Sequence, residues 1–367
     1  MQFFKKQIST FYKTLVREFF KICHGKIYFS KGKKYNQNVK IYEVKNKNIK
    51  KNDNTNYKIF EIKNGRIYND HVQNVACISN NRIINEISYQ QIEGNLKSAK
   101  FNSVINNGTP YIKKKIKGNV LNLSQGASGH SNYFHWLVDI LPKIKIFSEK
   151  FSSKDLNYLY LPKLKQFQKI SLNLLGYGKI KILDSKRFRH IEADILYAIE
   201  HPWYFKGYVH KENYHLPKWI VQWLRSKFLP LKKKIKSKKN IFIDRSESKY
   251  SHMQFINNKE IIEFFKKKNF MPYKVGKLSF QKQIYLFFNA NIIIGGHGAA
   301  FTNLIFCKPN TKIIEIKTKN HPSLVNKRIS YINNLRYNLI KISKIKNSKN
   351  NGDMYINPEQ IYKFIKK

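Results

Sequence analysis

Residues 292–306 combine features that could bind a phosphate. The apolar run Ile-Ile-Ile at 292–294 leads into Gly-Gly-His-Gly at 295–298, and small residues follow. An apolar run that ends in glycine is typical of a buried parallel strand. A helix beginning after it would offer free backbone N–H groups and a favourable dipole to an anion. The alternative is a tight turn whose glycines serve only the bend. The segment matches neither the dinucleotide fingerprint nor the P-loop.

A second stretch could move a proton. On a helix that begins at Ser131 or Asn132, His135 and Asp139 lie four residues apart on one face. A carboxylate at this spacing can hydrogen-bond the imidazole, raise its basicity and fix its orientation, which suits a general base. The alternative is a capped core helix whose aspartate binds nearby backbone. Pro142 is expected to end or kink this helix.

Two further candidates follow apolar runs in the second half of the chain. Arg245-Ser246 comes after residues 240–243, and Glu315 lies in the run 312–316. Arginine can donate two parallel hydrogen bonds to a diphosphate, and a glutamate can accept from a ribose diol. A buried pair between Arg245 and Glu315 is the structural alternative.

The elements that must position these residues alternate along the second half. Apolar periodicity there predicts a Rossmann-like parallel sheet, with ligands outside the carboxyl ends of the strands. The expected strands are 240–243, 272–275, 292–294 and 312–316, with helices at 257–268 and 278–289. In the first half, the alternation of strand-like and helix-like runs predicts a parallel αβ section. Its expected strands are 158–161, 180–183 and 195–198, with a helix at 166–175. Short β-type runs between residues 57 and 116, including 84–88, predict an antiparallel or mixed entry section with turns at 64–65 and 107–108.

Composition bounds the class of protein without identifying it. A chain of 367 residues is long enough for two domains. The formal charge of +48 would suggest a nucleic-acid-binding protein, but the excess is mostly lysine dispersed along the chain. Cys23, Cys77 and Cys307 are widely spaced and support neither a zinc site nor a disulfide framework. With no apolar run of the roughly 20 residues that span a bilayer and no secretory signal pattern, a cytoplasmic protein is expected.

Residues 1–23 predict a basic amphipathic helix. Apolar residues recur at helical spacing from Phe4 to Ile22, with five lysines and arginines between them. Such a helix could lie on an anionic membrane surface at the inner face of the cytoplasmic membrane. A helix packed on its own domain is the slightly favoured alternative.

Four blocks together resemble glycosyltransferase family 61. They are His-Trp-Leu-Val-Asp-Ile-Leu-Pro at 135–142, Asp-Arg-Ser at 244–246, the helix opening at 257–260, and Gly-His-Gly-Ala-Ala-Phe-Thr-Asn-Leu-Ile-Phe at 296–306 before Pro309 and Ile-Ile-Glu at 313–315. The resemblance covers roughly residues 120–320. It implies an α/β fold of two Rossmann-like domains facing across a cleft, the GT-B architecture. It also implies an inverting transferase that uses a nucleotide-sugar donor, expected to be UDP-linked, without a bound metal or other cofactor.

The resemblance also distributes roles over the chain. His135 and Asp139 would be catalytic, with Asp139 orienting His135 as the favoured arrangement and the reverse left open. His130, Asn132 and Trp136 would lie on the acceptor side. The donor would contact Arg245, Ser246, Gly296, His297, Gly298, Ala299, Thr302, Asn303 and Glu315. Family members usually carry a second basic residue near Gln254, for which Lys249 or His252 would have to substitute.

The expected organisation has five parts. Residues 1–55 form the basic helix and an extension, 56–229 the acceptor-side domain, 230–239 a charged linker, 240–345 the nucleotide-sugar-binding domain, and 346–367 a tail with a helix that packs back on the first domain. The expected acceptor is a glycan or glycolipid of bacterial capsule, lipopolysaccharide or surface polysaccharide. A basic nucleic-acid-binding protein and a non-catalytic transferase-fold scaffold are the alternatives, and retention of donor binding would separate them from the enzyme.

Overall fold

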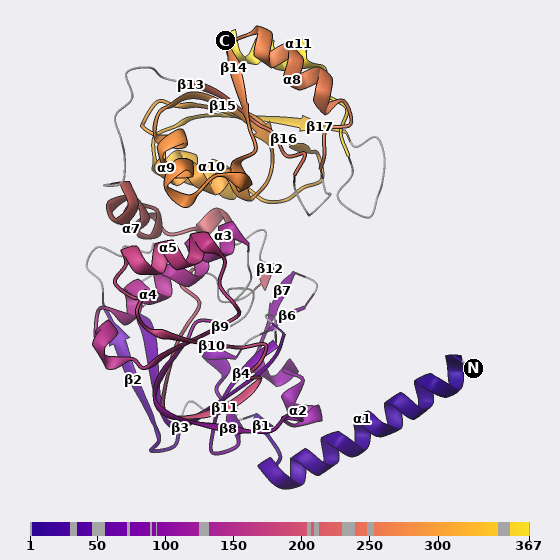
Figure 1. Ribbon diagram of the computed structural model, residues 1–367, viewed down its shortest axis with the longest axis vertical. Coiled ribbons are helices and arrows are strands. Elements are labelled where there is room, and N and C mark those ends of the chain that lie inside the picture. The colour runs from indigo at the N-terminus through magenta and orange to yellow at the C-terminus, as the bar shows by residue number, and fades with distance from the viewer. Residues whose placement is uncertain are drawn as a thin grey trace. The chain divides into compact units, whose positions relative to one another are not determined.

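The computed structural model divides the chain into two units, Met1–Val209 and His210–Lys367 (Figure 1). It describes residues 2–29, 35–45, 56–71, 74–88, 90–92, 94–124, 132–203, 207–208, 213–229, 239–247, 253–343 and 353–366. The predicted linker at 230–239 lies almost wholly outside these residues. Each unit is described by itself.

The first unit is built on a mixed sheet that has nine strands within the described residues. Its strands are β1 (Tyr28–Phe29), β2 (Val39–Val44), β3 (Tyr57–His71), β4 (Asn74–Ser79), β5 (Arg82–Ile83), β8 (Lys114–Asn122), β9 (Tyr158–Leu161), β10 (Lys181–Asp184) and β11 (His190–Ile199). Strands β2 to β5 and β11 pair antiparallel around β3, whereas β11, β8, β9 and β10 run parallel. The mixed entry section and the parallel section are therefore both confirmed. The antiparallel half departs from a Rossmann-like sheet, because β2 to β5 pair antiparallel with their neighbours and such a sheet is mostly parallel.

Short elements and helices complete the first unit. A small sheet joins β6 (Gln90–Ile92), β7 (Asn95–Lys97) and β12 (Gly207–Tyr208). The helical elements are α1 (Gln2–His24), η1 (Asn85–Ile87), η2 (Ala99–Phe101), α2 (Val104–Asn107), α3 (Tyr133–His135), η4 (Trp136–Ile140), α4 (Leu141–Phe147), η5 (Ser153–Asp155) and α5 (Gln166–Leu174).

Two local predictions for this unit were wrong. Residues 84–88 contain the 3-10 turn η1 in place of a strand. The expected turn at Asn64-Gly65 lies inside β3, where Asn64 has a φ of 51°. Gly65 pairs with Ala193 and Lys63 with Ile195 of β11, so the register is the same on both sides of Asn64 and the strand continues without a turn.

The second unit contains a parallel sheet, five-stranded in the described part of the chain, in the order β14-β13-β15-β16-β17. The strands are β13 (Lys239–Ile243), β14 (Phe270–Tyr273), β15 (Ala290–Gly296), β16 (Lys312–Thr318) and β17 (Arg336–Ile342). In chain order this is 2-1-3-4-5, the order of the flavodoxin-like doubly wound folds. The strand order reverses between β13 and β15, and ligands of such folds bind at that switch point.

Helices cover both faces of this sheet (Figure 1). They are η6 (Asn213–His215), α7 (Lys218–Phe228), α8 (Asn258–Lys267), η8 (Val275–Lys277), α9 (Phe280–Phe288), η9 (Ala299–Phe306), α10 (Val325–Ile332) and α11 (Pro358–Lys366). The four predicted strands and two predicted helices are present with small shifts at their ends, whereas α10 and β17 were not predicted. The stretch after Gly298 forms a 3-10 helix.

Two expected boundaries differ from the structure. The division at Val209 lies before the predicted boundary at 229, because α7 packs within the second unit. There Arg225 donates to the carbonyls of Ile305 and Cys307, the latter at 2.8 Å. The terminal helix α11 does not cross back to the first domain. Its Ile361 belongs to the core of the second unit, and Tyr362 contacts Phe264 of α8.

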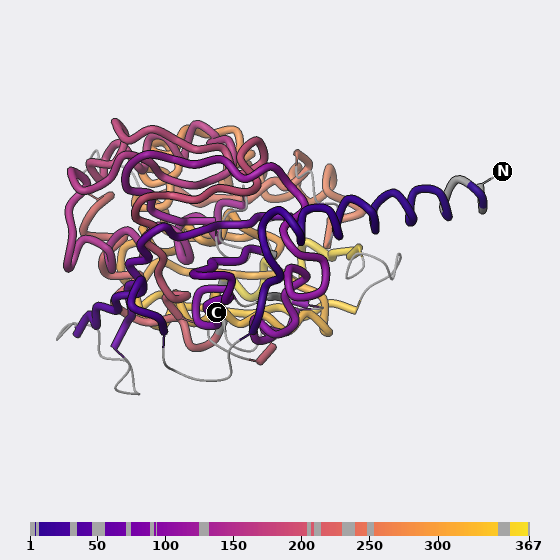
Figure 2. Tube along the Cα trace, turned by 90° about the horizontal axis from the view of Figure 1, so that it is seen from below, coloured from indigo at the N-terminus to yellow at the C-terminus, as the bar shows by residue number. Residues whose placement is uncertain are grey.

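Helix α1 extends from the remainder of the first unit and joins it only near its C-terminal end (Figure 2). Its residues from Phe4 to Phe11 are exposed wherever their burial is described, so the slightly favoured expectation of a helix packed on its own domain is wrong for this part. Among the described residues, no helix is both long and apolar enough to cross a membrane.

Candidate active site

A π-helical turn positions the first pair of candidate residues. Asn132 caps the helix start, because its side-chain oxygen accepts from the Phe134 N–H at 2.8 Å. One turn later the helix widens into η4, a conformation that is rare and often occurs at functional sites. Pro142 then lies in the first turn of α4, directly after this π turn. The helix therefore continues past Pro142, with a π turn where an end or kink was expected.

The His135 imidazole and the Asp139 carboxylate form a hydrogen-bonded pair on this helix. Nδ1 of His135 lies 2.6 Å from Oδ2 of Asp139. An ionised carboxylate accepts only, so Nδ1 carries the proton and Nε2 presents its lone pair. The histidine side chain is 26% exposed, whereas the aspartate is fully buried. His135 is therefore the member of the pair that a substrate hydroxyl can reach.

Two further buried groups lie against Asp139. Trp203 donates its indole N–H to Oδ1 at 2.7 Å, and His201 Nε2 lies 3.5 Å from the same oxygen. Burial alone would raise the pKa of Asp139, but the imidazoles of His201 and His135 outweigh it and hold the pKa below its usual range. Burial lowers the pKa of His201 to about 4, so this imidazole is neutral near pH 7.

Lys143, one helical turn after Asp139, adds a buried cation. Lys143 lies in α4 and is fully buried. Burial lowers the pKa of Lys143 to about 8, against the opposing attraction of the Asp139 carboxylate. The lysine therefore balances much of the carboxylate charge in the interior at neutral pH. A balanced interior leaves Asp139 ionised and able to hold His135 in one tautomer.

The second candidate cluster lies at the switch point of the parallel sheet. Ile243 at the end of β13 pairs with Gly295 of β15, and Gly295 pairs with Glu315 of β16. The residues that follow β13 and β15 therefore emerge side by side. This register brings Arg245 and His297 together from positions far apart in the sequence.

Arg245 lies against the backbone that begins η9. Its Nη1 donates to the carbonyl of His297 and, at 3.4 Å, to that of Met253. A Cβ on Gly298 would lie 3.2 Å from both Cζ and Nε of Arg245, so glycine permits this close approach. Burial lowers the pKa of Arg245 to about 10, and the guanidinium stays charged at neutral pH. A fixed cation beside the first N–H groups of a helix is suited to an anionic ligand.

Glu315 orients His297 in the same way that Asp139 orients His135. Oε1 of Glu315 accepts from Nδ1 of His297 and, at 2.7 Å, from the Asn326 amide, while Oε2 accepts from the Tyr337 hydroxyl. Burial tends to raise the pKa of Glu315, and the contact with His297 and these hydrogen bonds lower it below the usual range. Both carboxylate oxygens are occupied and the residue is 1% exposed. Neither a ribose contact by Glu315 nor a buried Arg245–Glu315 pair matches this geometry.

Other predicted site residues have structural contacts. Trp136 is fully buried and donates to the Ser171 hydroxyl at 2.8 Å, so its acceptor-side role does not match its place in the core. Asn303 is also fully buried, and its amide donates to Gln283 Oε1 at 3.0 Å. The Thr302 hydroxyl is buried, with no hydrogen-bond partner among the described residues. All three side chains are buried, so they are not exposed to a ligand in solution.

The remaining predicted residues lie at or near the switch point, or outside the described part of the chain. Ser246 is exposed after β13, where its hydroxyl donates to Asp244 at 3.1 Å. Gly296 ends β15, and Ala299, partly exposed, begins η9. His130 and the proposed substitutes Lys249 and His252 lie outside the described residues.

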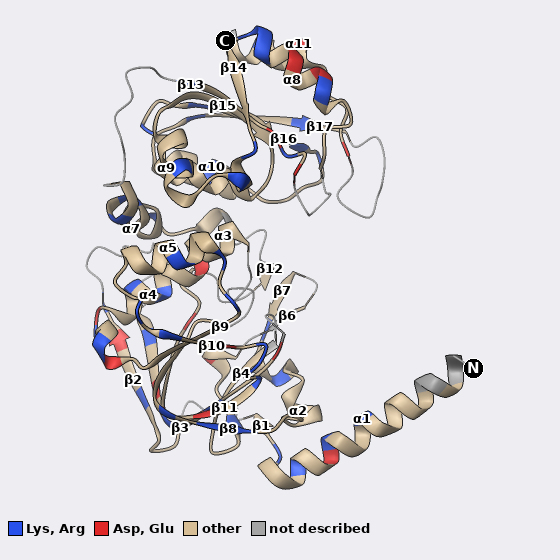
Figure 3. Cartoon of the chain, in the orientation of Figure 1, with Lys and Arg blue, Asp and Glu red and all other residues tan. Residues whose placement is uncertain are grey.

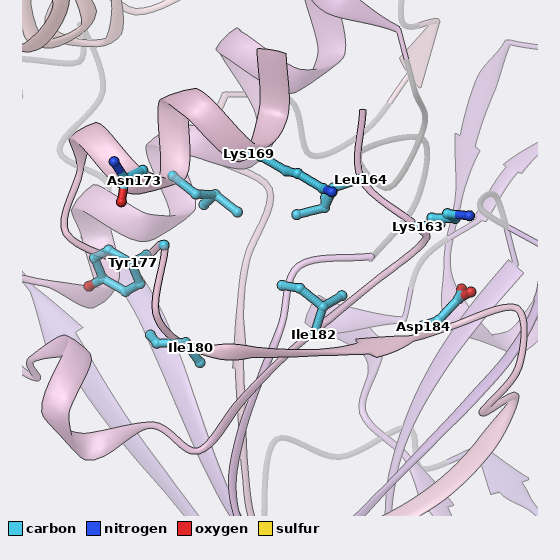
Figure 4. A pocket seen from close by; sticks show the side chains of 10 residues that line it. Lys163, Leu164, Lys169, Asn173, Tyr177, Ile180, Ile182 and Asp184 are labelled. Atoms are coloured by element: carbon cyan, nitrogen blue, oxygen red, sulfur yellow. The ribbon is translucent and has the colours of Figure 1, made fainter. Parts of the chain in front are cut away.

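A separate hollow lies in the first unit between α5, the segments on either side of that helix, and strand β10 (Figure 4). It has a volume of about 490 Å³ and a mostly apolar lining that includes Leu172, Tyr177 and Ile182, with Lys163, Lys169 and Asp184 around them. None of the proposed catalytic or donor-binding residues lines it.

A comparison with known protein families found a match. The sequence model of glycosyltransferase 61 matches residues 133–314, a range that includes His135, Asp139, Arg245 and His297. The chain therefore contains a glycosyltransferase family 61 domain over these residues. It is a glycosyltransferase. A search of curated proteins found no match to it.

The transferase also contains functional candidates that sequence reasoning missed. His201 and Trp203 contact Asp139 from a segment more than sixty residues later in the chain, and no spacing rule links them to it. Lys143 was detectable, because it follows Asp139 by one helical turn. Asn326, in α10, and Tyr337, in β17, come from the two elements that were not predicted.

Figure 3 shows how the basic residues of the transferase are distributed. Lys and Arg occur on helices and strands of both units. Their spread over many elements agrees with the expectation, drawn from dispersed lysine, that charge alone does not define a nucleic-acid site.

Proposed function

We propose that the transferase moves a sugar from a nucleotide-sugar donor, with UDP as the expected carrier, to a hydroxyl group of a glycan acceptor. The observation that carries the proposal is the cluster at the β13–β15 switch point. There Arg245, the His297 imidazole and the start of η9 offer a cation and N–H groups to a diphosphate. Ser246, Gly296, Gly298 and Ala299 complete the proposed donor contacts.

His135 is the proposed general base. Its Nε2 takes the proton of the acceptor hydroxyl while the oxygen attacks the anomeric carbon of the donor. The bond from that carbon to the phosphate oxygen breaks as the new glycosidic bond forms, and the nucleoside diphosphate leaves with the electron pair. Attack from the face opposite the leaving group inverts the anomeric configuration.

Asp139 and Glu315 are positioning residues in this proposal. Each is buried and holds a histidine through Nδ1, so neither carboxylate is expected to touch the substrate. Arg245, His297 and backbone N–H groups offset the negative charge that develops on the leaving diphosphate. On this account the reaction proceeds without a bound metal ion.

The proposal includes a GT-B type division of labour, with the acceptor activated by the first unit and the donor held by the second. The acceptor class follows from the family resemblance: a glycan or glycolipid of the bacterial capsule, lipopolysaccharide or surface polysaccharide, modified on the cytoplasmic side. Asn132 and, from the sequence alone, His130 are proposed acceptor-side residues.

A donor screen tests this function. The purified full chain is mixed with UDP-, GDP-, TDP- and CMP-sugars in EDTA, with and without capsule or lipopolysaccharide oligosaccharides, and nucleotide release is measured. Acceptor-dependent release of one nucleotide, with a product of inverted anomeric configuration by NMR, is expected. Release that requires a divalent metal, or a product of retained configuration, would contradict the proposed mechanism. No donor turnover together with no nucleotide binding would favour the scaffold.

A further inference from the structure

Helix α1 carries an apolar face that nothing in the described part of the first unit covers. Its large apolar residues are between 54% and 86% exposed. They are Phe4, Ile8, Phe11, Tyr12, Leu15, Phe19 and Ile22. At 3.6 residues per turn these positions fall within an arc of about 100°. One side of the helix is therefore a continuous apolar stripe.

The opposite side of α1 is the side that the first unit holds. Val16, Arg17, Phe20, Lys21 and His24 are the partly buried residues of the helix. At the C-terminal end, His24 Nε2 lies 3.1 Å from the Tyr111 carbonyl, and Arg66 donates to the His24 carbonyl at 3.2 Å. The last turn is thereby fixed, and the apolar stripe faces away from the unit that holds the helix.

The positive charge of α1 indicates which kind of surface could cover the stripe. The segment contains five lysines and arginines (Lys5, Lys6, Lys13, Arg17 and Lys21) and one acidic residue, Glu18, which pairs with Lys21 at 2.7 Å. A second copy of the chain would bring another strongly basic helix against the first. An anionic bilayer surface offers negative charge to the basic residues and an apolar boundary to the stripe.

We propose that α1 lies in the headgroup region of an anionic phospholipid bilayer, with the stripe from Phe4 to Ile22 towards the acyl chains. The helix would run parallel to the membrane plane and hold the first unit at the surface. This docking is separate from the chemistry, because none of the residues in the stripe belongs to the proposed active site. An enzyme held there would meet acceptors that are anchored in the same membrane.

Vesicle flotation tests the proposal with a matched pair of variants. The full chain is mixed at moderate salt with phosphatidylcholine vesicles, or with vesicles containing about one third phosphatidylglycerol. F11D/L15D places two negative charges in the stripe. T10D/T14D adds the same charge one position earlier, off the stripe. Because the two variants have equal net charge, a difference between them reports the apolar contact alone.

We expect the natural chain to float with anionic vesicles and to stay unbound with neutral ones. F11D/L15D should lose at least tenfold in bound fraction, and T10D/T14D should lose threefold or less. Both variants should keep the helical circular-dichroism signal and the nucleotide binding of the natural chain. In addition, the emission of L15W relative to the unsubstituted chain should shift to the blue with anionic vesicles.

Three outcomes would overturn the proposal. The first is equal flotation of the two variants, which would mean that general basicity drives binding. The second is no flotation of the natural chain. The third is self-association in sedimentation experiments that F11D/L15D abolishes while vesicle binding is absent, which would identify a second copy as the occupant.

Discussion

The two units of the transferase each hold a histidine through Nδ1 with a buried carboxylate, yet the two pairs are built differently. His135 and Asp139 lie on one helix, and the second carboxylate oxygen of Asp139 accepts from the indole of Trp203. His297 directly follows β15, and Glu315 lies in the neighbouring strand β16. The carboxylate of Glu315 also accepts hydrogen bonds from Asn326 and Tyr337. In both pairs Nδ1 faces the carboxylate and Nε2 faces away from it.

The difference lies in the charge around each imidazole. Near Asp139 the buried Lys143 balances the carboxylate, which suits a histidine that must accept a proton. Beside His297 lies Arg245, on the backbone that starts η9. A fixed guanidinium and helix N–H groups suit a site that binds an anion. The same pair of residue types therefore serves proton transfer in one place and phosphate binding in the other.

Removing each imidazole gives the largest contrast. H135A should lower nucleotide release from the donor by about 10²–10⁴-fold, the range for a lost general base. It should leave the dissociation constant for UDP unchanged. H297A should instead weaken UDP binding. Release is measured at saturating donor, and UDP binding by calorimetry. Weakened UDP binding in H135A, with turnover unchanged at saturation, would reverse the assignment of the two pairs.

Changing the carboxylate of the second pair should give an intermediate effect. E315Q removes the charge-assisted bond to His297, and UDP affinity should fall about tenfold because such bonds contribute about 1.5–3 kcal/mol. Y337F keeps the carboxylate and removes only the hydroxyl contact, so it is the matched control and should lose about threefold or less. Thermal unfolding of both variants separates binding from folding. Equal affinity in E315Q and the natural chain would show that Glu315 does not position a ligand-binding histidine.

A pair of glycine substitutions tests the place of Arg245 more finely. In G298A the new Cβ would meet the guanidinium at 3.2 Å, and in G296A it would meet Phe255 at 3.2 Å. Both substitutions require a neighbouring side chain to shift slightly. Only in G298A is that side chain Arg245, because the new Cβ lies against its Cζ and Nε. UDP affinity should fall a few-fold in G298A and by a smaller factor in G296A. The opposite order in calorimetry would place the diphosphate nearer Phe255 than Arg245.

A further expected effect is a pH dependence of stability that comes from His201, which lies beside the first pair. Burial lowers the pKa of His201 to about 4, below its usual 6.5, so the unfolded chain binds the extra proton first as pH falls. This group therefore destabilises the fold progressively from about pH 6.5 towards pH 4. H201Q should remove that contribution, on the order of 2 kcal/mol at pH 4.5. Denaturant unfolding at pH 7 and pH 4.5 gives the comparison. An equal loss in both proteins would show that His201 is not a buried neutral imidazole.

The sequence predicted the parallel sheet of the second unit because its strands are short apolar runs separated by amphipathic helices. The runs at 292–294 and 312–316 became β15 and β16. Strand-end placement then brought Arg245 near His297, as the rule for parallel sheets requires. The pairing of His135 with Asp139 was also predictable, because it depends on helical spacing alone.

Contacts between distant segments were not predictable. Trp203 reaches Asp139, and Tyr337 reaches Glu315, through sheet and helix packing that leaves no local pattern. The burial of Trp136 was missed for a related reason: an amphipathic residue beside a catalytic candidate resembles a ligand contact until the position of Ser171 is known. The π turn at 136–140 likewise has no sequence rule beyond the nearby proline.

The most direct test of the account is calorimetric titration of the full chain with UDP, in EDTA and moderate salt, alongside R245A and H135A. Salt suppresses the weak polyanion binding expected of so basic a chain. The account predicts saturable one-site binding to the natural chain and to H135A, and its loss in R245A. Weak binding of equal strength in all three proteins, abolished by salt, would contradict the claim that the β13–β15 switch point holds the donor.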